Sequence, residues 1–220
     1  DKIKNFPKKY INKINIIPAL LRKKFYKIEK AKSINECINL LVIGGSQGAR
    51  IFDSFMRTSI IDLSKRYKLK IYQQTNLANF ENLKKFYKEH NISHELFDFN
   101  DDISALMSKA NICLTRAGAS TLAELVFLNL PFVAIPLPTS KDNHQFENAF
   151  FYYQIGCNWI LNQNEIKDMT IQNKLANIMI NKNEYLVKKI NMKNFSYQNT
   201  WNNINQKIIS IIDENRISKN

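Results

Sequence analysis

Three polar or glycine-rich segments of this sequence each follow a short apolar run, and their residue types suit an anionic ligand that carries hydroxyl groups. Segment 1 is GGSQG, residues 44–48, after the run LLVI. Glycines let a backbone turn sharply and approach a ligand without an intervening Cβ. Free N–H groups at the start of a following helix favour an anion, and Ser46 and Gln47 add polar side chains. Segment 1 predicts a phosphate-binding turn, although it lacks the G-K-[ST] ending of a Walker A loop; the alternative is a turn that serves packing alone.

Segment 2 is TRAGASTLAEL, residues 115–125. Gly118 occupies the expected turn from strand to helix, and Ser120 or Thr121 is suited to be the helix N-cap. Glu124 follows Thr121 by three residues and shares its helix face, where a carboxylate can accept hydrogen bonds from two ribose hydroxyls. The alternative is a capping box, because Thr121 and Glu124 have the S/T-x-x-E spacing. Three backbone N–H groups of this turn could hold a diphosphate: those of Ala119, Ser120 and Thr121.

Segment 3 is PLPTSKDNHQFENA, residues 136–149, and its prolines make a stiff exit from the preceding apolar run. Polar side chains crowd its middle: Asp142, Asn143, His144, Gln145 and Asn148. Amide side chains both donate and accept hydrogen bonds, which suits sugar hydroxyls. A lone histidine is more often a polar surface residue than a catalyst, so the cluster as a whole, and not His144 by itself, predicts a ligand site.

The elements that must position these segments alternate along the chain. Short apolar runs predict strands at 40–43, 69–73, 93–97, 111–114, 132–135 and 158–161, with helices at 49–66, 80–90, 103–107, 120–128 and 143–153 between them. A helical tail follows, at 175–180, 184–190 and 201–212. This alternation predicts a doubly wound α/β domain with a parallel sheet covered on both faces. Ligands of such sheets bind beyond the carboxyl ends of the strands, so we expect the three segments to meet there.

Composition narrows the class of protein. The chain has 220 residues, 45% of them hydrophobic, and a net charge of +13. The charge excess is nearly all lysine, spread among asparagine and isoleucine, which is typical of compositional bias; an anionic bilayer is a better candidate partner than nucleic acid. No run approaches the ~20 apolar residues of a membrane span, and the polar, lysine-rich start is unlike a secretory signal. The cysteines, without C-x-x-C spacing, favour a reducing cytoplasm over a disulfide framework or a zinc site: Cys37, Cys113 and Cys157.

In order and spacing, GGSQGAR, TRAGAST-LAEL and KDNHQ-ENA resemble the three motifs in the C-terminal domain of the MurG family. Members of that family transfer N-acetylglucosamine (GlcNAc) from UDP-GlcNAc to lipid I, undecaprenyl-diphosphate-MurNAc-pentapeptide, with inversion. The product, lipid II, serves peptidoglycan synthesis. The resemblance implies a Rossmann-like domain, the C-terminal half of a GT-B glycosyltransferase, with a helical C-terminal tail.

The resemblance also implies a role for each matching residue. The Gly45 backbone, with Ser46 and Gln47, would line the cleft near the donor diphosphate, and the FDFNDD segment at 97–102 would read the uracil edge. By the same resemblance, uracil would be bound by Phe99 and Asn100, and the phosphates by Gly118, Ala119, Ser120 and Thr121. The ribose would be bound by Glu124, and GlcNAc by His144 and Gln145.

A hinge segment is implied as well. PALLRKKF, residues 18–25, resembles the family's G-N-P-V-R hinge, which would make Arg22 the arginine that contacts the diphosphate. The sequence departs from the family pattern at two places. Pro18 and Ala19 stand where glycine and asparagine are expected, and His144 replaces a glutamine, although imidazole still offers one hydrogen bond.

The expected organisation is the end of an N-terminal domain with the hinge (residues 1–25), a UDP-sugar-binding domain (26–165) and a helical segment (166–220). The general base and the lipid I site are expected in an N-terminal domain outside this chain, so we nominate no catalytic residue, no metal and no cofactor. The expected partners are UDP-GlcNAc, lipid I through that other domain, and the inner face of the bacterial plasma membrane, on which the enzyme would be peripheral, but no nucleic acid. These residues alone are expected to bind the donor weakly without turnover.

Other functions fit the same residues. One is the donor-binding half of another UDP-sugar transferase, such as a glycolipid enzyme, and another is a sugar-nucleotide epimerase. A third, from a different class, is a non-catalytic UDP-sugar-binding subunit that needs a separate partner to supply the acceptor domain. A nucleic-acid-binding module would need clustered basic residues with exposed aromatic side chains, whereas the aromatic residues here fall mainly at core-like spacings.

Overall fold

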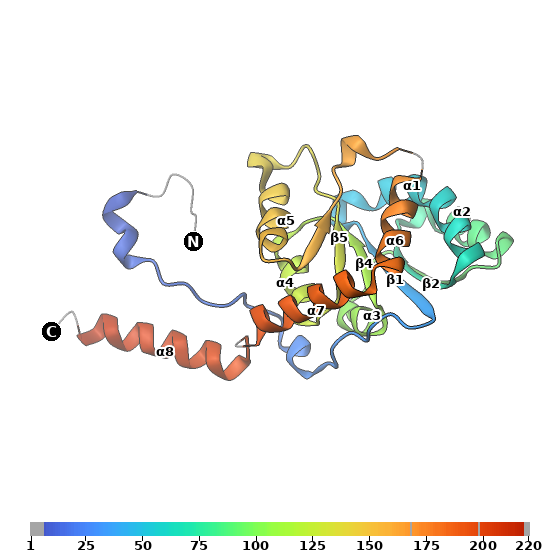
Figure 1. Ribbon diagram of the computed structural model, residues 1–220. Helices are drawn as coiled ribbons and strands as arrows, with labels where there is room; N and C mark the ends of the chain where they lie inside the picture. The colour runs from blue at the N-terminus through green and yellow to red at the C-terminus, as the bar shows by residue number, and fades with distance from the viewer. Residues whose placement is uncertain (1–6, 168, 198, 218–220) are drawn as a thin grey trace.

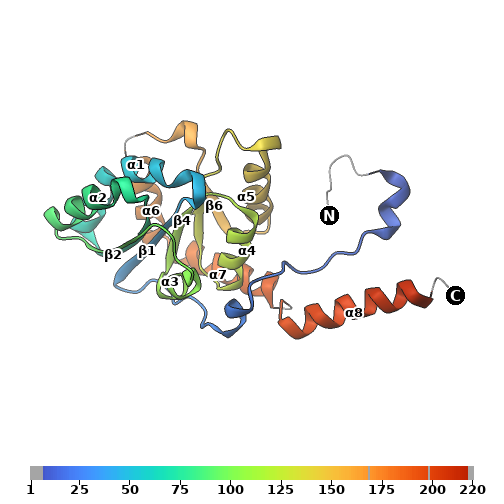
Figure 2. The ribbon, with the colours of Figure 1, turned by 180° about the vertical axis from the view of Figure 1, so that it is seen from behind.

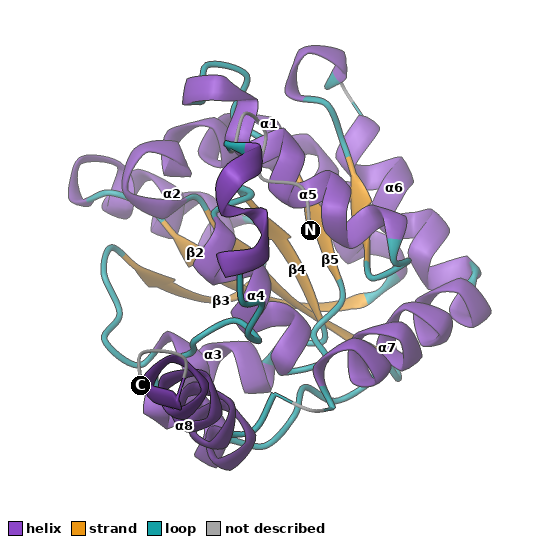
Figure 3. Cartoon of the chain, turned by 90° about the vertical axis from the view of Figure 1, so that its left-hand side faces the viewer, coloured by secondary structure: helices purple, strands orange, loops and turns teal. Residues whose placement is uncertain are grey.

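The computed structural model describes residues 7–167, 169–197 and 199–217, without the side chains of 46–50 and 215–217. The described residues form one parallel six-stranded sheet in the order β3-β2-β1-β4-β5-β6, with helices on both faces (Figures 1 and 3). The strands are β1 Cys37–Ile43, β2 Lys68–Gln74, β3 Ser93–Phe97, β4 Ile112–Thr115, β5 Phe132–Ala134 and β6 Asn158–Ile160. The predicted doubly wound α/β fold is confirmed.

Helices connect and follow the strands. They are α1 Gly45–Arg66, α2 Leu77–Glu89, α3 Ile103–Lys109, α4 Ala119–Phe127, α5 His144–Gln154, α6 Thr170–Ile180, α7 Lys182–Ser196 and α8 Trp201–Ile217. Short 3-10 helices occur at Lys8–Lys13 (η1), Lys23–Lys27 (η2), Lys141–Asn143 (η3) and Gln163–Glu165 (η4). The largest shift from the predicted bounds within the sheet domain is at α1, which begins at Gly45 rather than near residue 49, so segment 1 is itself the first turn of the helix.

The core lies on both faces of the sheet because strand side chains alternate in direction. Along β1, Leu40 and Val42 pack into a cluster with α1, α2 and α6, whereas Leu41 packs into a second cluster with α3, α4 and α5. All three side chains are fully buried. Each stabilises the fold by about 1.5–3 kcal/mol relative to leaving it exposed. This two-sided burial is why β1 reads as a continuous apolar run.

The helical tail divides into a packed part and an extended part. The Tyr185 hydroxyl of α7 donates to the Asn111 carbonyl at 2.7 Å, and Lys189 Nζ donates to the carbonyls of Ala31 and Asn129 at 2.7 and 2.8 Å. By contrast, α8 and the N-terminal segment both project from the body on the same side (Figures 1 and 2). Helices α6 and α7 therefore share the core of the sheet, and the division at residues 25 and 165 stays a prediction.

Gly156, which follows α5, has a left-handed backbone with φ +72°, and a Cβ added there would lie 2.5 Å from Asn191 Nδ2 of α7. We expect Gly156→Ala to lower the free energy of unfolding by about 1–3 kcal/mol, because an L side chain strains this backbone and displaces the Asn191 amide. Urea unfolding measures the loss.

Gly118→Ala is the matched control, since φ there is −69° and an added Cβ meets its nearest atom at 3.8 Å. Its expected cost is below about 1 kcal/mol, that of a changed N-cap. Equal losses in the two variants would contradict the argument from the Gly156 backbone.

Candidate functional site

The strands end level with one another, and this brings the three polar segments to one edge of the sheet. The last residue of β1, Ile43, pairs with the last of β4, Thr115, which pairs with the last of β5, Ala134. Segments 1, 2 and 3 leave these neighbouring ends. The Ile135 N–H donates to the Thr115 carbonyl at 2.8 Å and so continues the ladder into segment 3. The predicted convergence of the three segments at the carboxyl edge is confirmed.

Segment 1 turns at Gly45, where φ is +66° and no atom lies within 4 Å of an added Cβ among the described residues. The Gly45 N–H donates to Gln74 Oε1 at 3.1 Å, and Gln74 Nε2 donates to the Asp98 carbonyl at 3.0 Å. Gln74, which sequence reasoning missed, thus links segment 1 to the loop that contains Phe99. The predicted side-chain roles of Ser46 and Gln47 fall outside the described side chains; their backbone belongs to the first turn of α1.

A buried carboxylate holds α1 against β2 and α2. Asp53 is 5% exposed and accepts from Gln73 Nε2 at 2.7 Å, Thr75 Oγ1 at 2.9 Å and Asn79 Nδ2 at 2.7 Å. The Tyr87 hydroxyl donates to Gln73 Oε1, and burial raises the pKa of Tyr87. Because three donors satisfy Asp53, its burial is tolerated, and the N-terminal half of α1 is held against the end of β2 and against α2. No motif in the sequence identifies this network.

Segment 2 begins α4 differently from the prediction. The N-cap is Gly118, with no side-chain capping bond, and its carbonyl accepts from the Leu122 N–H at 3.0 Å. The predicted N-cap at Ser120 or Thr121 is therefore wrong, and so is the Thr121–Glu124 capping box, because the helix has already started. The first-turn N–H groups of a helix have no partner within it, and here they belong to residues 119–121.

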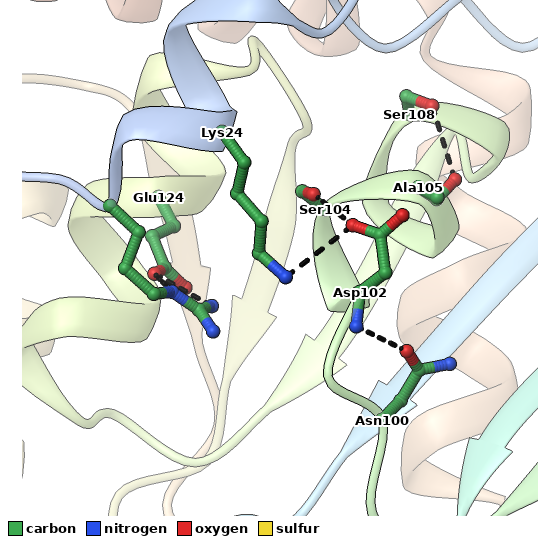
Figure 4. A network of polar contacts seen from close by, with 8 residues as sticks. Lys24, Asn100, Asp102, Ser104, Ala105, Ser108 and Glu124 are labelled. Carbon is green, nitrogen blue, oxygen red and sulfur yellow. Dashed lines mark hydrogen bonds and ion pairs between the residues drawn. The ribbon is translucent and has the colours of Figure 1, made fainter.

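Glu124 instead pairs with the hinge. Its Oε1 accepts from Arg22 Nη2 at 3.0 Å and from Arg22 Nε at 3.1 Å (Figure 4). Glu124 is 7% exposed. Burial raises the pKa of its carboxyl group, while Arg22 and, more weakly, Lys24 lower it. The structure thus brings together the two residues whose predicted ligands are the ribose and the diphosphate, although 102 positions separate them.

A second contact joins the hinge to the loop between β3 and α3. Lys24 Nζ lies 3.5 Å from Asp102 Oδ1, which also accepts from Ser104 Oγ at 2.6 Å (Figure 4). That Ser104 bond is the main reason that the pKa of Asp102 is lowered. The Asn100 side chain accepts from the Asp102 N–H at 2.7 Å, whereas Phe99 is 80% exposed. The hinge therefore lies between the predicted ribose and uracil subsites.

Segment 3 is tied to segment 2 by amide side chains. Gln145 Oε1 accepts from the N–H groups of Ala117 at 3.2 Å and Leu137 at 3.0 Å, and Asn148 Nδ2 donates to the Ala117 carbonyl at 3.0 Å. A sugar contact by Gln145 would therefore use Nε2. The exposed His144 begins α5, with Nδ1 2.7 Å from the Lys141 carbonyl.

Within the described ranges, no three His, Cys, Asp or Glu side chains gather as a metal site would require. None of the described helices is both long and apolar enough to cross a membrane. The three cysteines are unpaired: Cys37, Cys113 and Cys157.

Known proteins share this sequence and fold. A transferase from Pelagibacter ubique (strain HTCC1062) is 63% identical over 213 residues, which cover 97% of this chain and 60% of the relative. Its name is UDP-N-acetylglucosamine--N-acetylmuramyl-(pentapeptide) pyrophosphoryl-undecaprenol N-acetylglucosamine transferase. A protein of the same name from Rickettsia canadensis (strain McKiel) is 34% identical over 81% of this chain and 52% of its own length. This chain thus spans 52% to 60% of these curated relatives.

Solved structures agree on the fold. The crystal structure of Acinetobacter baumannii MurG has a TM-score of 0.67 at 25% identity, covering 80% of this chain and 52% of that one. A UDP-GlcNAc 2-epimerase from Neisseria meningitidis has a TM-score of 0.53 at 17% identity, over 86% of this chain and 46% of that one. The second likeness concerns the fold alone.

The family model described as the glycosyltransferase family 28 C-terminal domain matches residues 39–204. That range runs from β1 to the start of α8 and contains all three segments at the carboxyl edge. The chain therefore belongs to glycosyltransferase family 28, as a C-terminal domain of that family.

Proposed function

We propose that this chain is the donor-binding part of an enzyme that transfers GlcNAc from UDP-GlcNAc to lipid I, forming lipid II with inversion. The observation that carries the proposal is the level ending of β1, β4 and β5, which gathers two helix starts and a polar amide cluster at one edge. The name of the 63% identical relative supports the same donor and acceptor.

The diphosphate would lie at the starts of α1 and α4. Both helix N-termini present N–H groups without intrahelical partners, and their dipoles favour negative charge. Gly45 gives the donor room to approach, because no described atom outside its own turn of α1 lies within 4 Å of an added Cβ. When the lipid I hydroxyl attacks the anomeric carbon of GlcNAc, the bond from that carbon to the diphosphate breaks and UDP leaves. The same N–H groups, with Arg22, would stabilise the charge that develops on UDP.

The ribose would bind Glu124. Both contacts with Arg22 fall on Oε1, so Oε2 can accept from a ribose hydroxyl while the ion pair remains. The uracil would meet the backbone near Phe99 and Asn100, and the GlcNAc hydroxyls would meet His144 and Gln145. Gly118, Ala119, Ser120 and Thr121 would hold the phosphates, with Ser46 and Gln47 close by.

The general base and the lipid I site would lie outside these residues, in an N-terminal domain, since this chain covers only 52% to 60% of the length of the relatives. The enzyme would act on the inner face of the bacterial plasma membrane as a peripheral protein, to which a net charge of +13 would add attraction for anionic lipid.

Replacing Glu124 tests the ribose contact. We expect Glu124→Ala to weaken UDP-GlcNAc binding at least tenfold, because hydrogen bonds to a carboxylate are worth about 1.5–3 kcal/mol each. Calorimetric titration of the chain with UDP-GlcNAc, UDP-GalNAc and UDP-glucose measures the effect, and the unaltered chain should prefer UDP-GlcNAc.

The control is Glu95→Ala, which removes an exposed carboxylate of β3 and should leave the affinity unchanged. Equal affinity for the three donors, or wild-type binding by Glu124→Ala, would contradict the proposal.

The pH dependence of UDP binding tests the Arg22–Glu124 pair. Binding should weaken as pH falls through the pKa of Glu124, which burial holds above its usual 4.5, because the protonated carboxyl loses its charge. Arg22→Gln removes an influence that lowers this pKa, so the acid limb should move to higher pH. Titration of both proteins with UDP between about pH 4.5 and 7 locates the limb. An unmoved limb would show that Arg22 does not act on Glu124 in solution.

These 220 residues should bind UDP-GlcNAc and yet form no lipid II. The reason is that no catalytic base or acceptor site is assigned to them. The measurement is incubation with UDP-GlcNAc and lipid I, with the full-length Pelagibacter relative as the positive control. Lipid II formed by the chain alone would refute the proposal that the general base and the acceptor site lie outside these residues.

A further inference from the structure

Arg116, the second residue of segment 2, is a buried cation. The residue is 7% exposed, and among the residues that the structure describes no carboxylate lies within ion-pair distance of it. Arg22, by contrast, is half-exposed at its side chain and pairs with Glu124. Arg116 therefore carries a charge that the described protein does not neutralise.

Its contacts reach the end of β1, helix α1 and the exit of β5. The Arg116 N–H donates to the Ile43 carbonyl, at the end of β1, at 3.2 Å. Its Nη1 donates to the carbonyls of Ile135 at 3.0 Å and Pro136 at 3.4 Å, where β5 gives way to segment 3. Its guanidinium carbon lies 5.5 Å from the ring centre of Phe52, on α1. Arg116 thus contacts the exits of β1 and β5 and one side of α1, the helix that begins in segment 1.

The structural contacts of Arg116 do not by themselves require a positively charged side chain. A neutral donor could serve the two carbonyls, whereas a buried charge without a counterion costs several kcal/mol. Arg116 Nε is buried and has no hydrogen-bond partner within the described part of the chain. Burial lowers the pKa of this guanidinium, but arginine stays charged at neutral pH. The charge therefore suits an anion supplied from outside the chain.

The proposed diphosphate position is within range of this charge. Arg116 stands two residues before Gly118, the N-cap of α4, and its guanidinium lies 3.0 Å from the Ile135 carbonyl at the exit of β5. The charge and the start of α4 therefore lie at the same edge of the sheet, where charges interact over distances up to about the Debye length of 8 Å at physiological salt.

We propose that Arg116 is a positioning residue for the donor diphosphate: it holds the ends of β1, β4 and β5 together and places an uncompensated positive charge behind segment 2. This inference rests on the proposed function, since it assumes that the edge binds UDP-GlcNAc. It differs from the role proposed for Arg22, because Arg116 acts from beneath the helix start through the backbone and the field, without touching the donor.

Comparison of UDP with uridine isolates the diphosphate, because both ligands share the nucleoside. We expect Arg116→Gln to weaken UDP binding about tenfold or more while uridine binding changes less than about threefold. Arg116→Lys, which keeps the charge, should retain most of the preference for UDP. The control is Arg66→Gln, the same change of charge at the far end of α1, about 30 Å from the first turn of the helix, and it should leave both affinities unchanged. Circular dichroism and thermal unfolding verify that each variant is folded.

A folded Arg116→Gln with the wild-type ratio of UDP to uridine affinity would overturn the inference. Equally weakened binding of UDP and uridine in both the Gln and the Lys variants would also overturn it, because that result indicates a purely structural role for Arg116. If Arg116→Gln does not fold, the test rests on the Arg116→Lys variant. A tenfold lower preference for UDP over uridine in the folded Lys variant would contradict the inference, because lysine keeps the charge. If the unaltered chain binds neither ligand, the proposed function fails instead.

Discussion

Strands β1, β4 and β5 run parallel and end at the same level, with Ile43, Thr115 and Ala134 in register. Everything proposed for the ligand site depends on this constraint. Parallel pairing sends each following segment off the same edge of the sheet, and the level ends leave no strand standing above its neighbours. The same register extends outward, since Gln74 pairs with Phe97 and Ala134 with Ile160 at the ends of the outer strands. The edge is therefore level, with two helix starts and an amide cluster side by side, and it is there that we propose a single donor binds.

Two kinds of polar residue occupy this edge. One kind makes its hydrogen bonds to other protein groups and holds the segments in place: Asp53, Gln145 and Arg116. Arg22 and Glu124, by contrast, pair with each other, and we propose that both also contact the donor. A ligand site needs both, because groups that bind a ligand are effective only when a supporting shell fixes their position.

The fold was predictable from the sequence because the central strands β1, β4 and β5 are buried on both faces, and such strands read as apolar runs between helical patterns. The convergence of the three segments followed from parallel topology alone. The N-cap of α4 was not predictable in this way, since Gly118, Ser120 and Thr121 are all acceptable caps and only the path of the chain selects one. The contact between Arg22 and Glu124 joins residues 102 positions apart, and the Gln74 and Asp53 networks depend on side chains that belong to no motif. Local patterns carry no information on such long-range pairings.

The central claim is that one UDP-GlcNAc molecule contacts all three segments at once. Backbone amide NMR spectra of the chain, recorded as UDP-GlcNAc is added, test this most directly. The account predicts that the amides of residues 44–48, 98–102, 116–124 and 137–145 shift together along a single binding curve, while those of α7 and α8 do not move. Shifts confined to one segment, or clustered at the opposite edge of the sheet, would contradict it.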